Sequence, residues 1–176
     1  IVEWHERNRF SPVSGAATTI ERAGWVQRDP ETGREVFPRT DPAVIMLVHD
    51  GGDRCVLGRQ AVWPAGRFSI LAGFVEPGES AEAAVAREVA EEVGIAVTDV
   101  RYVSSQPWPF PQSLMLGFVA RATTEELRID HDEIEEARWF SREELRSGTG
   151  PQALPPTVSI ARHIIDRWVA GEFSTY

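Results

Sequence analysis

A cluster of glutamates is the feature of this sequence best suited to chemistry. The residues concerned are Glu88, Glu91 and Glu92. The segment Ser80–Val93 that contains them is rich in Ala and Glu, and Gly94 follows it, so we expect a helix that ends there. Residues three and four apart share a helix face, which places the three carboxylates within an arc of roughly 100°. Because such charges repel one another, the pattern predicts a site for a hard cation, Mg²⁺ or Mn²⁺, that can bridge to a substrate phosphate.

The residues around the glutamates are consistent with such a site. Arg87 stands one turn before Glu91 and is placed to orient it. Gly73 and Gly78 predict a tight loop that brings Glu79 back towards the acidic face. An apolar stripe beside the glutamates can dock the helix onto a sheet: Val85, Val89 and Val93. A solvated acidic helix is the alternative, and it accounts for the Glu91–Glu92 pair but not for the whole pattern.

The segment resembles the Nudix box, G-x5-E-x7-R-E-U-x-E-E-x-G-U, in which U is a bulky aliphatic residue. Its specified positions are filled by Gly73, Glu79, Arg87, Glu88, Val89, Glu91, Glu92, Gly94 and Ile95. The resemblance implies an α/β/α sandwich and metal-dependent hydrolysis of nucleoside diphosphates linked to another moiety. By position, it implies metal ligands at Glu88, Glu91 and Glu92, with Arg87 and Glu79 as orienting partners.

A proline-aromatic segment follows the glutamate helix. Between Gln106 and Ser113, three prolines alternate with two aromatic residues, Trp108 and Phe110. Proline lacks the donor that a central strand needs, so we expect a stiff loop over residues 104–115. Its flat apolar faces suit a nucleobase or nicotinamide ring, and a rigid turn that covers the core is the alternative.

This segment resembles the S-Q-P-W-P-F-P-x-S signature of NADH pyrophosphatases (NAD-capped RNA hydrolases). Residues 37–42 and 159–161 resemble further parts of that family. The resemblance implies a dinucleotide pocket lined by Phe74, Gln106, Trp108, Ser113, Met115 and Ala161, and a homodimer in which Phe37 reaches the partner's pocket. It also implies a fourth metal ligand at Glu133, for which a charged loop residue is the alternative.

The N-terminal part departs from that family. The zinc ribbon expected there has its ligand positions filled by Ser11, Ser14, Asp29 and Thr32. Since hydroxyls are poor zinc ligands, we expect no structural zinc, and hairpins held by Trp25 and hydrogen bonds. The chain starts at Ile1 and lacks the family's additional N-terminal domain, so we expect a piece of a longer product.

The remaining elements predict the fold class α/β (α+β). Apolar runs predict strands at Ala43–Val48, Cys55–Gly58, Val97–Val103, Leu114–Ala122 and Ala137–Phe140. A second helix is expected at Thr157–Ala170, so a mixed sheet should lie between two helices. We divide the 176 residues into degenerate ribbon hairpins at 1–38 and a catalytic domain at 39–176.

Composition narrows the functional classes. A formal net charge of −9 disfavours broad electrostatic capture of nucleic acid or of anionic membrane, although bound metal can reverse the local sign. No apolar run approaches the roughly 20 residues that cross a bilayer. The single cysteine, Cys55, excludes an intrachain disulfide, and we expect a cytoplasmic protein without membrane partners.

The reaction predicted from these features is hydrolysis of NAD(H) to AMP and NMN(H), with Glu91 or Glu92 as general base. Removal of NAD caps from RNA is the second activity, because the acidic charge disfavours tight binding of the RNA body. The alternatives are a Nudix hydrolase of another substrate such as ADP-ribose, a non-catalytic NAD-sensing domain, and an interaction module formed by the hairpins.

Overall fold

The computed structural model describes residues 1–173 in two compact units. One unit comprises Ile1–Asp41 together with Trp108–Ser113. The other comprises Pro42–Pro107 and the described residues from Leu114 onward, and it contains the glutamates.

A six-stranded sheet forms the centre of the second unit. Its strand order is β7-β8-β4-β5-β9, and β6 pairs with β4 outside this path. The strands are β4 (Asp41–His49), β5 (Arg54–Arg59), β6 (Leu71–Phe74), β7 (Val97–Trp108), β8 (Ser113–Ala122) and β9 (Glu136–Ser141). Strand β4 pairs antiparallel with both β5 and β6, and it is buried over most of its length.

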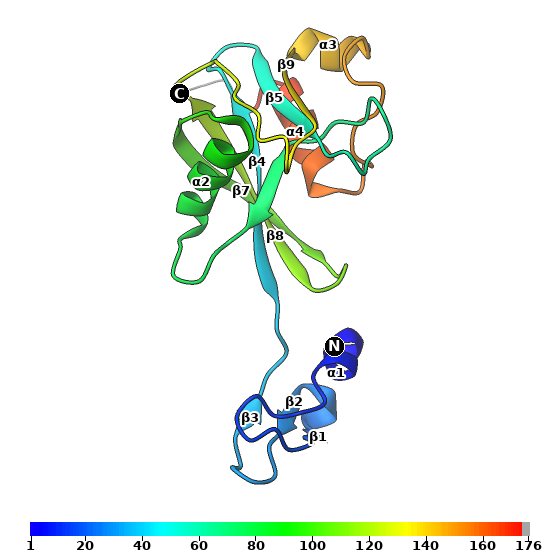
Figure 1. The fold of residues 1–176 in the computed structure, drawn as a ribbon. Coiled ribbons are helices and arrows are strands. Elements are labelled where there is room, and N and C mark those ends of the chain that lie inside the picture. The colour runs from blue at the N-terminus through cyan, green and yellow to red at the C-terminus, as the bar shows by residue number, and fades with distance from the viewer. Residues whose placement is uncertain (174–176) are drawn as a thin grey trace. The chain divides into compact units, whose positions relative to one another are not determined.

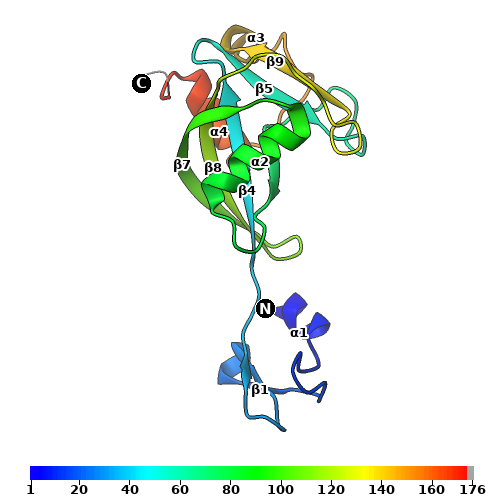
Figure 2. The same ribbon diagram turned by 60° about the vertical axis from the view of Figure 1, so that its left-hand side comes forward.

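One helix packs on each face of this sheet (Figures 1 and 2). Alternate residues of a strand point to opposite faces, and β4 shows this directly. Its residues Val44, Met46 and Val48 join the core under α2 (Ala81–Val93). Its residues Ile45 and Leu47 join the core under α4 (Ile160–Val169). The α/β/α sandwich that the sequence predicted is confirmed.

Local signals set the limits of the glutamate helix. The Ser80 hydroxyl caps its first turn by accepting a hydrogen bond from the Ala83 N–H at 3.2 Å. Gly94 ends it with φ 70°, a left-handed conformation that glycine adopts without steric penalty. The observed α2 therefore matches the predicted segment. A short helix, α3 (Arg142–Ser147), starts with a Ser141–Glu144 capping box that the sequence reading missed.

The first unit is a small three-stranded antiparallel sheet with a short helix. Its elements are α1 (Val2–Arg7), β1 (Thr19–Glu21), η1 (Arg22–Gly24), β2 (Val26–Arg28) and β3 (Glu35–Val36). Trp4 and Val26 supply its buried apolar side chains. The expectation that Trp25 holds the hairpins is wrong, since Trp25 is 63% exposed.

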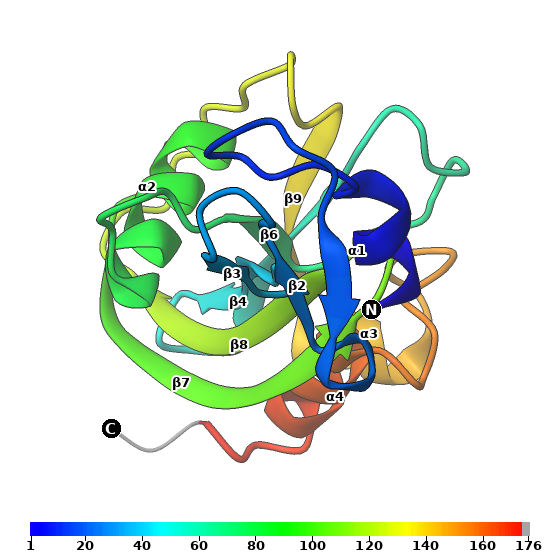
Figure 3. The same cartoon turned by 90° about the horizontal axis from the view of Figure 1, so that it is seen from below.

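Two further expectations need correction. The predicted loop at residues 104–115 is mostly strand, because β7 continues through Pro107 to Trp108. Proline is tolerated there because β7 is the edge strand of the sheet, beside β8 (Figure 3). Gly73 lies within β6 rather than in a loop. Within the part of the chain that the structure describes, no helix has the length and apolar character needed to cross a membrane.

Candidate metal centre

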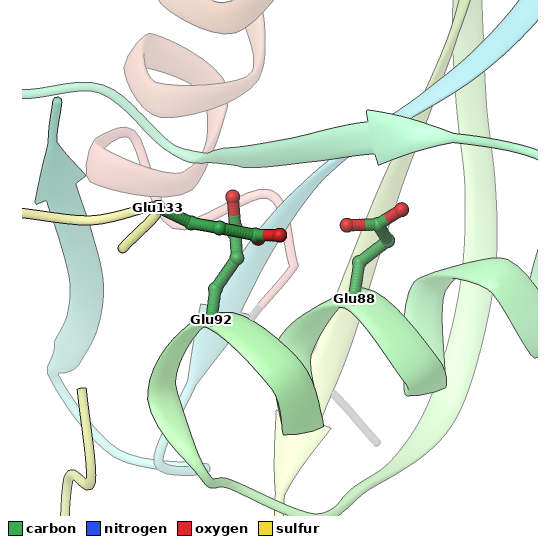
Figure 4. Close-up of side chains that lie close together, drawn as sticks. All are labelled: Glu88, Glu92 and Glu133. Carbon is green, nitrogen blue, oxygen red and sulfur yellow. The ribbon is translucent and has the colours of Figure 1, made fainter. Parts of the chain in front are cut away.

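Three glutamates converge in the second unit. Glu88 and Glu92 lie one turn apart on α2, and Glu133 extends its carboxylate towards them from the loop before β9 (Figure 4). One carboxylate oxygen from each lies within 4.8 Å of the others, and we call these three residues the glutamate cluster. The arrangement brings together three of the four metal ligands predicted from the sequence.

The loop that carries Glu133 is tied to the end of α2. The Asp130 N–H donates to the Glu92 carbonyl at 3.0 Å, and the Arg128 N–H donates to the Val93 carbonyl at 2.8 Å. On its other side, the Glu135 N–H donates to the Arg59 carbonyl of β5 at 2.9 Å. These backbone bonds fix the loop against both the helix and the sheet, so residues 41 positions apart in sequence meet at one site.

Gly73 makes room for the first glutamate. A Cβ atom at this position would lie 1.9 Å from the Glu88 carboxyl carbon and 2.0 Å from its Oε2. No side chain fits there while Glu88 keeps its place, so β6 presents bare backbone to the cluster. The glycine is therefore needed for close approach and not for a turn, whereas Gly78, with φ 89°, has the turn conformation that the sequence predicted.

The glutamate cluster holds negative charge that its surroundings do not compensate. Burial raises the pKa of Glu88, although its contact with Arg87 opposes this. Burial, reinforced by the charges of Glu88 and Glu133, raises the pKa of Glu92 to about 8. The Glu92 Oε2 atom is buried and has no hydrogen-bond partner. Carboxylates that converge in this way favour a bound cation.

Arg87 organises the carboxylates next to the cluster. Its guanidinium binds Glu79 through two parallel bonds, at 2.9 and 3.0 Å. The same group donates to Glu88 Oε1 at 2.9 Å and to the carbonyl of Phe74 at 2.9 Å. It also donates to Glu91 Oε2 at 2.8 Å. Arg87 thus links the loop, the end of β6 and the helix.

Glu91 differs from Glu88 and Glu92 in its surroundings. It is exposed, and among the described residues it does not belong to the group whose oxygens lie within 4.8 Å of one another. Its role as a metal ligand therefore stays a prediction. The helix pattern alone did not separate Glu91 from Glu88 and Glu92, because the difference arises from which part of the arc faces β6 and the Glu133 loop.

A pocket of about 130 Å³ adjoins the cluster and was not predicted. Glu92 and Ile134 lie on its wall, together with Gln60, Trp63 and Ser69 from the segment that joins β5 to β6. Nothing in the sequence of that connecting segment indicated a site, because its residues carry no recognisable motif or period.

The predicted substrate-binding residues fall in both units. Phe37, Trp108 and Ser113 belong to the first unit, in which the Trp108 and Phe110 rings meet edge to face at 5.4 Å. Phe74, Gln106, Met115 and Ala161 belong to the second. There Phe74 is 58% exposed at the end of β6, Met115 packs against the α4 core, and Ala161 is buried within it. The Gln106 amide donates to the Val158 carbonyl and accepts from the Ile160 N–H, which joins β7 to the start of α4.

A second polar cluster occupies the ribbon positions of the first unit. Asp29 is fully buried, and its Oδ2 accepts hydrogen bonds from the hydroxyls of Ser11 at 2.6 Å and Ser14 at 2.8 Å. Its Oδ1 accepts from the backbone N–H groups of Glu31 at 2.9 Å and Thr32 at 3.2 Å. These bonds, led by that of Ser11, hold the pKa of Asp29 well below its usual range. We call these residues the Asp29 cluster.

Comparison with known proteins decides the family. Residues 39–167 match the NUDIX domain family. The chain belongs to the Nudix family. It is similar to the NAD-capped RNA hydrolase NudC of Mycobacterium bovis, with 54% identity over 183 residues that cover 98% of this chain and 58% of that protein. It is also similar to the human NAD-capped RNA hydrolase NUDT12, with 44% identity covering 96% of this chain and 40% of that protein.

Solved structures agree on the fold. The crystal structure of a NUDIX hydrolase from Nitrosomonas europaea superimposes with a TM-score of 0.72 at 18% identity, covering 92% of this chain and 90% of that one. The chain spans somewhat more than half the length of the curated NudC relatives that it matches, at 58%.

Proposed function

We propose that this chain hydrolyses the diphosphate bond of NAD(H), giving AMP and NMN(H), and that it also acts on the NAD cap of RNA. The observation that carries this proposal is the glutamate cluster within a Nudix domain. The names of the NudC and NUDT12 relatives support the choice of NAD-capped RNA as a substrate. A Nudix hydrolase of ADP-ribose and a non-catalytic NAD-sensing domain are the competing functions.

The residues of the cluster fit a divalent metal. Mg²⁺ and Mn²⁺ prefer oxygen ligands, and Glu88, Glu92 and Glu133 offer carboxylates alone. The buried, unpartnered Oε2 of Glu92 is a ligand atom that no protein donor satisfies. The chemistry that Mg²⁺ or Mn²⁺ supplies when bound is neutralisation of the diphosphate charge and a lower pKa for water.

The protein's own groups hold this site in shape and move the proton. Arg87 fixes Glu79, Glu88 and Glu91 through the bonds described above, so the carboxylates need little rearrangement when substrate binds. We propose that the carboxylate of Glu91 or Glu92 accepts the proton of the attacking water. The exposed position of Glu91 gives it access to solvent, and the place of Glu92 in the cluster gives it access to the diphosphate.

A homodimer is part of the proposal. Phe37 and Phe110 of the first unit expose 58% and 73% of their surface, and exposed apolar side chains commonly mark interfaces. Light scattering on the chain tests this, and a strict monomer with undiminished activity contradicts a pocket shared between subunits. We also propose a cytoplasmic location, because the single cysteine, Cys55, leaves the fold independent of disulfides.

Product analysis tests the substrate directly. The chain is incubated with Mg²⁺ or Mn²⁺ and, separately, with NADH, NAD⁺, ADP-ribose and NAD-capped RNA. We expect NMN(H) and AMP from the dinucleotides and slower turnover of ADP-ribose. Faster cleavage of ADP-ribose than of either dinucleotide contradicts the proposal, and no cleavage of any substrate favours the sensing domain.

Trp108 provides a test of the ring-binding surface. Stacking of a base on an aromatic side chain contributes roughly 1–3 kcal/mol by alanine substitution. We therefore expect Trp108→Ala to lower kcat/KM for NADH by about 10- to 100-fold while the affinity for Mn²⁺ stays the same. Val62→Ala is the control, because Val62 is 86% exposed and belongs to neither site. If Trp108→Ala leaves NADH hydrolysis unchanged, residues 104–115 have a structural role and do not bind the ring of the substrate.

A further inference from the structure

Arg59 is a buried cation at the point where the loop that carries Glu133 enters the sheet. It is the last residue of β5, and it lies opposite Glu136, the first residue of β9. Arg59 is only 8% exposed. Since a buried guanidinium is costly unless its donors are paired, its contacts indicate what this position is used for.

Arg59 binds the residue two positions beyond Glu133. Its Nη1 group donates to a carboxylate oxygen of Glu135, in an ion pair whose glutamate side chain is half exposed. Its backbone carbonyl accepts a hydrogen bond from the Glu135 N–H at 2.9 Å. Because the main chain and the side chain of Arg59 both bind Glu135, they fix where the backbone of the loop lies beside β5.

The other Nη group of Arg59 contacts the wall of the pocket beside the cluster. It donates to the Trp63 carbonyl at 2.9 Å. Trp63 lines the pocket of about 130 Å³ together with Glu92 and Ile134. The guanidinium therefore links the Glu133 loop to the segment that joins β5 to β6, and both segments contribute to the same pocket.

Stability alone does not account for this arginine. Its Nε atom is buried and has no hydrogen-bond partner among the described residues. A buried ion pair commonly adds little to the free energy of unfolding, and an unsatisfied buried donor lowers it. What the contacts of Arg59 do provide is a fixed position for the loop.

Glu133 is the member of the glutamate cluster that depends most on such a position. Glu88 and Glu92 are buried on α2, whereas Glu133 is exposed and comes from a loop (Figure 4). Its carboxylate lies within 4.8 Å of the others only while the loop keeps its place. We propose that Arg59 is a positioning residue that holds Glu133 in the glutamate cluster through its contacts with Glu135. This inference rests on the proposed metal centre and adds to it a residue outside the cluster.

The sign of the effect on cation binding separates positioning from simple electrostatics. Arg59 carries a positive charge, so its removal would favour a nearby cation if charge alone mattered. If Arg59 positions a ligand, its removal weakens cation binding instead. Groups that orient metal ligands commonly contribute roughly 10- to 100-fold to metal affinity.

Calorimetric titration of the metal-free full chain with Mn²⁺ tests the proposal. We expect Arg59→Gln to weaken Mn²⁺ binding about tenfold. Arg138→Gln is the matched control, because it also removes a positive charge from the sheet, but its guanidinium lies over Phe68 and Phe140 of the core under α4. We expect this control to bind Mn²⁺ at least as tightly as wild type. Unchanged or tighter binding in Arg59→Gln overturns the proposal.

A double variant localises the effect at Glu133. If Arg59 acts through this ligand, its loss has no further effect once the ligand is gone. We therefore expect Glu133→Ala and Arg59→Gln/Glu133→Ala to bind Mn²⁺ with affinities within about twofold of each other. A further loss of about tenfold in the double variant indicates a general structural role and overturns the assignment. Glu135→Gln, which changes a half-exposed side chain, provides the same comparison if Arg59→Gln does not fold.

Hydrogen exchange in the metal-free chain separates failure of this inference from failure of the proposed metal centre. We expect the Glu135 amide, which donates to Arg59, to exchange faster in Arg59→Gln than in Arg138→Gln. If wild type binds no Mn²⁺, the proposed metal centre is contradicted, and exchange at this amide still decides whether Arg59 holds the loop. Equal exchange in the two variants overturns the positioning role.

Discussion

The two units of this protein treat buried carboxylates in opposite ways. The second unit brings the buried Glu88 and Glu92 together with the exposed Glu133, and it leaves Glu92 Oε2 without a hydrogen-bond partner. The first unit buries a single carboxylate, Asp29, and surrounds it with donors. The pKa of Glu92 is accordingly raised, to about 8, whereas that of Asp29 is lowered. Carboxylates that converge with too few donors therefore indicate a metal site, whereas a buried acid surrounded by donors does not.

The same contrast bears on the prediction that the hairpins of the first unit hold no structural zinc. In the Asp29 cluster, two hydroxyls and two backbone N–H groups converge on one side chain. A carboxylate that accepts several hydrogen bonds is stabilised in its charged form and can join two loops as a metal ion would. The two loops joined here carry Ser11 and Ser14 on one side and Glu31 and Thr32 on the other.

The largest expected effect comes from removing a charge from the glutamate cluster. Glu92→Gln keeps the size of the side chain but removes its negative charge, and it should lower kcat for NADH by about 100- to 10,000-fold. We expect Mn²⁺ binding to weaken in parallel, with the thermal midpoint in EDTA maintained or raised because repulsion is relieved. Near-wild-type turnover in this variant contradicts the assignment of the cluster as the catalytic centre.

Gly73→Ala should inactivate the site while the fold survives. The new Cβ would meet the far end of a flexible side chain, the Glu88 carboxyl group, at 1.9 Å, so this carboxylate has to move. A displacement of about 1 Å can cost roughly 100-fold in rate. Gly52→Ala is the matched control, since its Cβ would meet the Asp50 side chain at 3.3 Å outside the site. Equal activity of the two variants in an NADH assay would show that the close approach of Gly73 has no functional role.

Glu92→Gln and Gly73→Ala also separate the features of the site that could be predicted from the sequence from those that could not. The motif spacing placed Glu88, Glu92 and Arg87 on one helix, because helical geometry is local and periodic. It did not place Gly73 in a strand, since that depends on pairing with Val44 of β4, far away in the sequence. The loop predicted around Pro107 was wrong for a similar reason. Proline excludes a central strand, but the sequence does not show that β7 is an edge strand, because strand order depends on the assembled sheet.

The ribbon positions show a further limit. Their residue types argued against zinc, yet nothing in the sequence indicated that Ser11 and Ser14 donate to Asp29. Likewise, the buried residue of helix α1, Trp4, was missed in favour of the exposed Trp25, because residue type alone does not distinguish a core tryptophan from a surface one. Contacts between segments that carry no motif were therefore the main part of the site and fold that could not be predicted.

Smaller effects are expected in the first unit. Asp29→Ala leaves two hydroxyls and two backbone N–H groups without their acceptor. Only the Ser11 hydroxyl among these donors belongs to a buried residue, and one buried unsatisfied group costs about 1–3 kcal/mol. We expect faster hydrogen exchange at the amides of Glu31 and Thr32, with Asp29→Asn intermediate because it keeps one acceptor oxygen. Exchange rates equal to those of the wild type would mean that the Asp29 cluster does not hold these loops.

Metal analysis of three proteins tests the contrast between the units most directly. Zinc is first quantified in wild type, Glu92→Gln and Asp29→Asn as purified, and each protein is then dialysed against EDTA and titrated with Mn²⁺ by calorimetry. We predict Mn²⁺ binding in wild type and in Asp29→Asn, its loss in Glu92→Gln, and no stoichiometric zinc in any of the three. Mn²⁺ binding that survives Glu92→Gln but disappears in Asp29→Asn, or about one tightly held zinc per chain, would contradict this account.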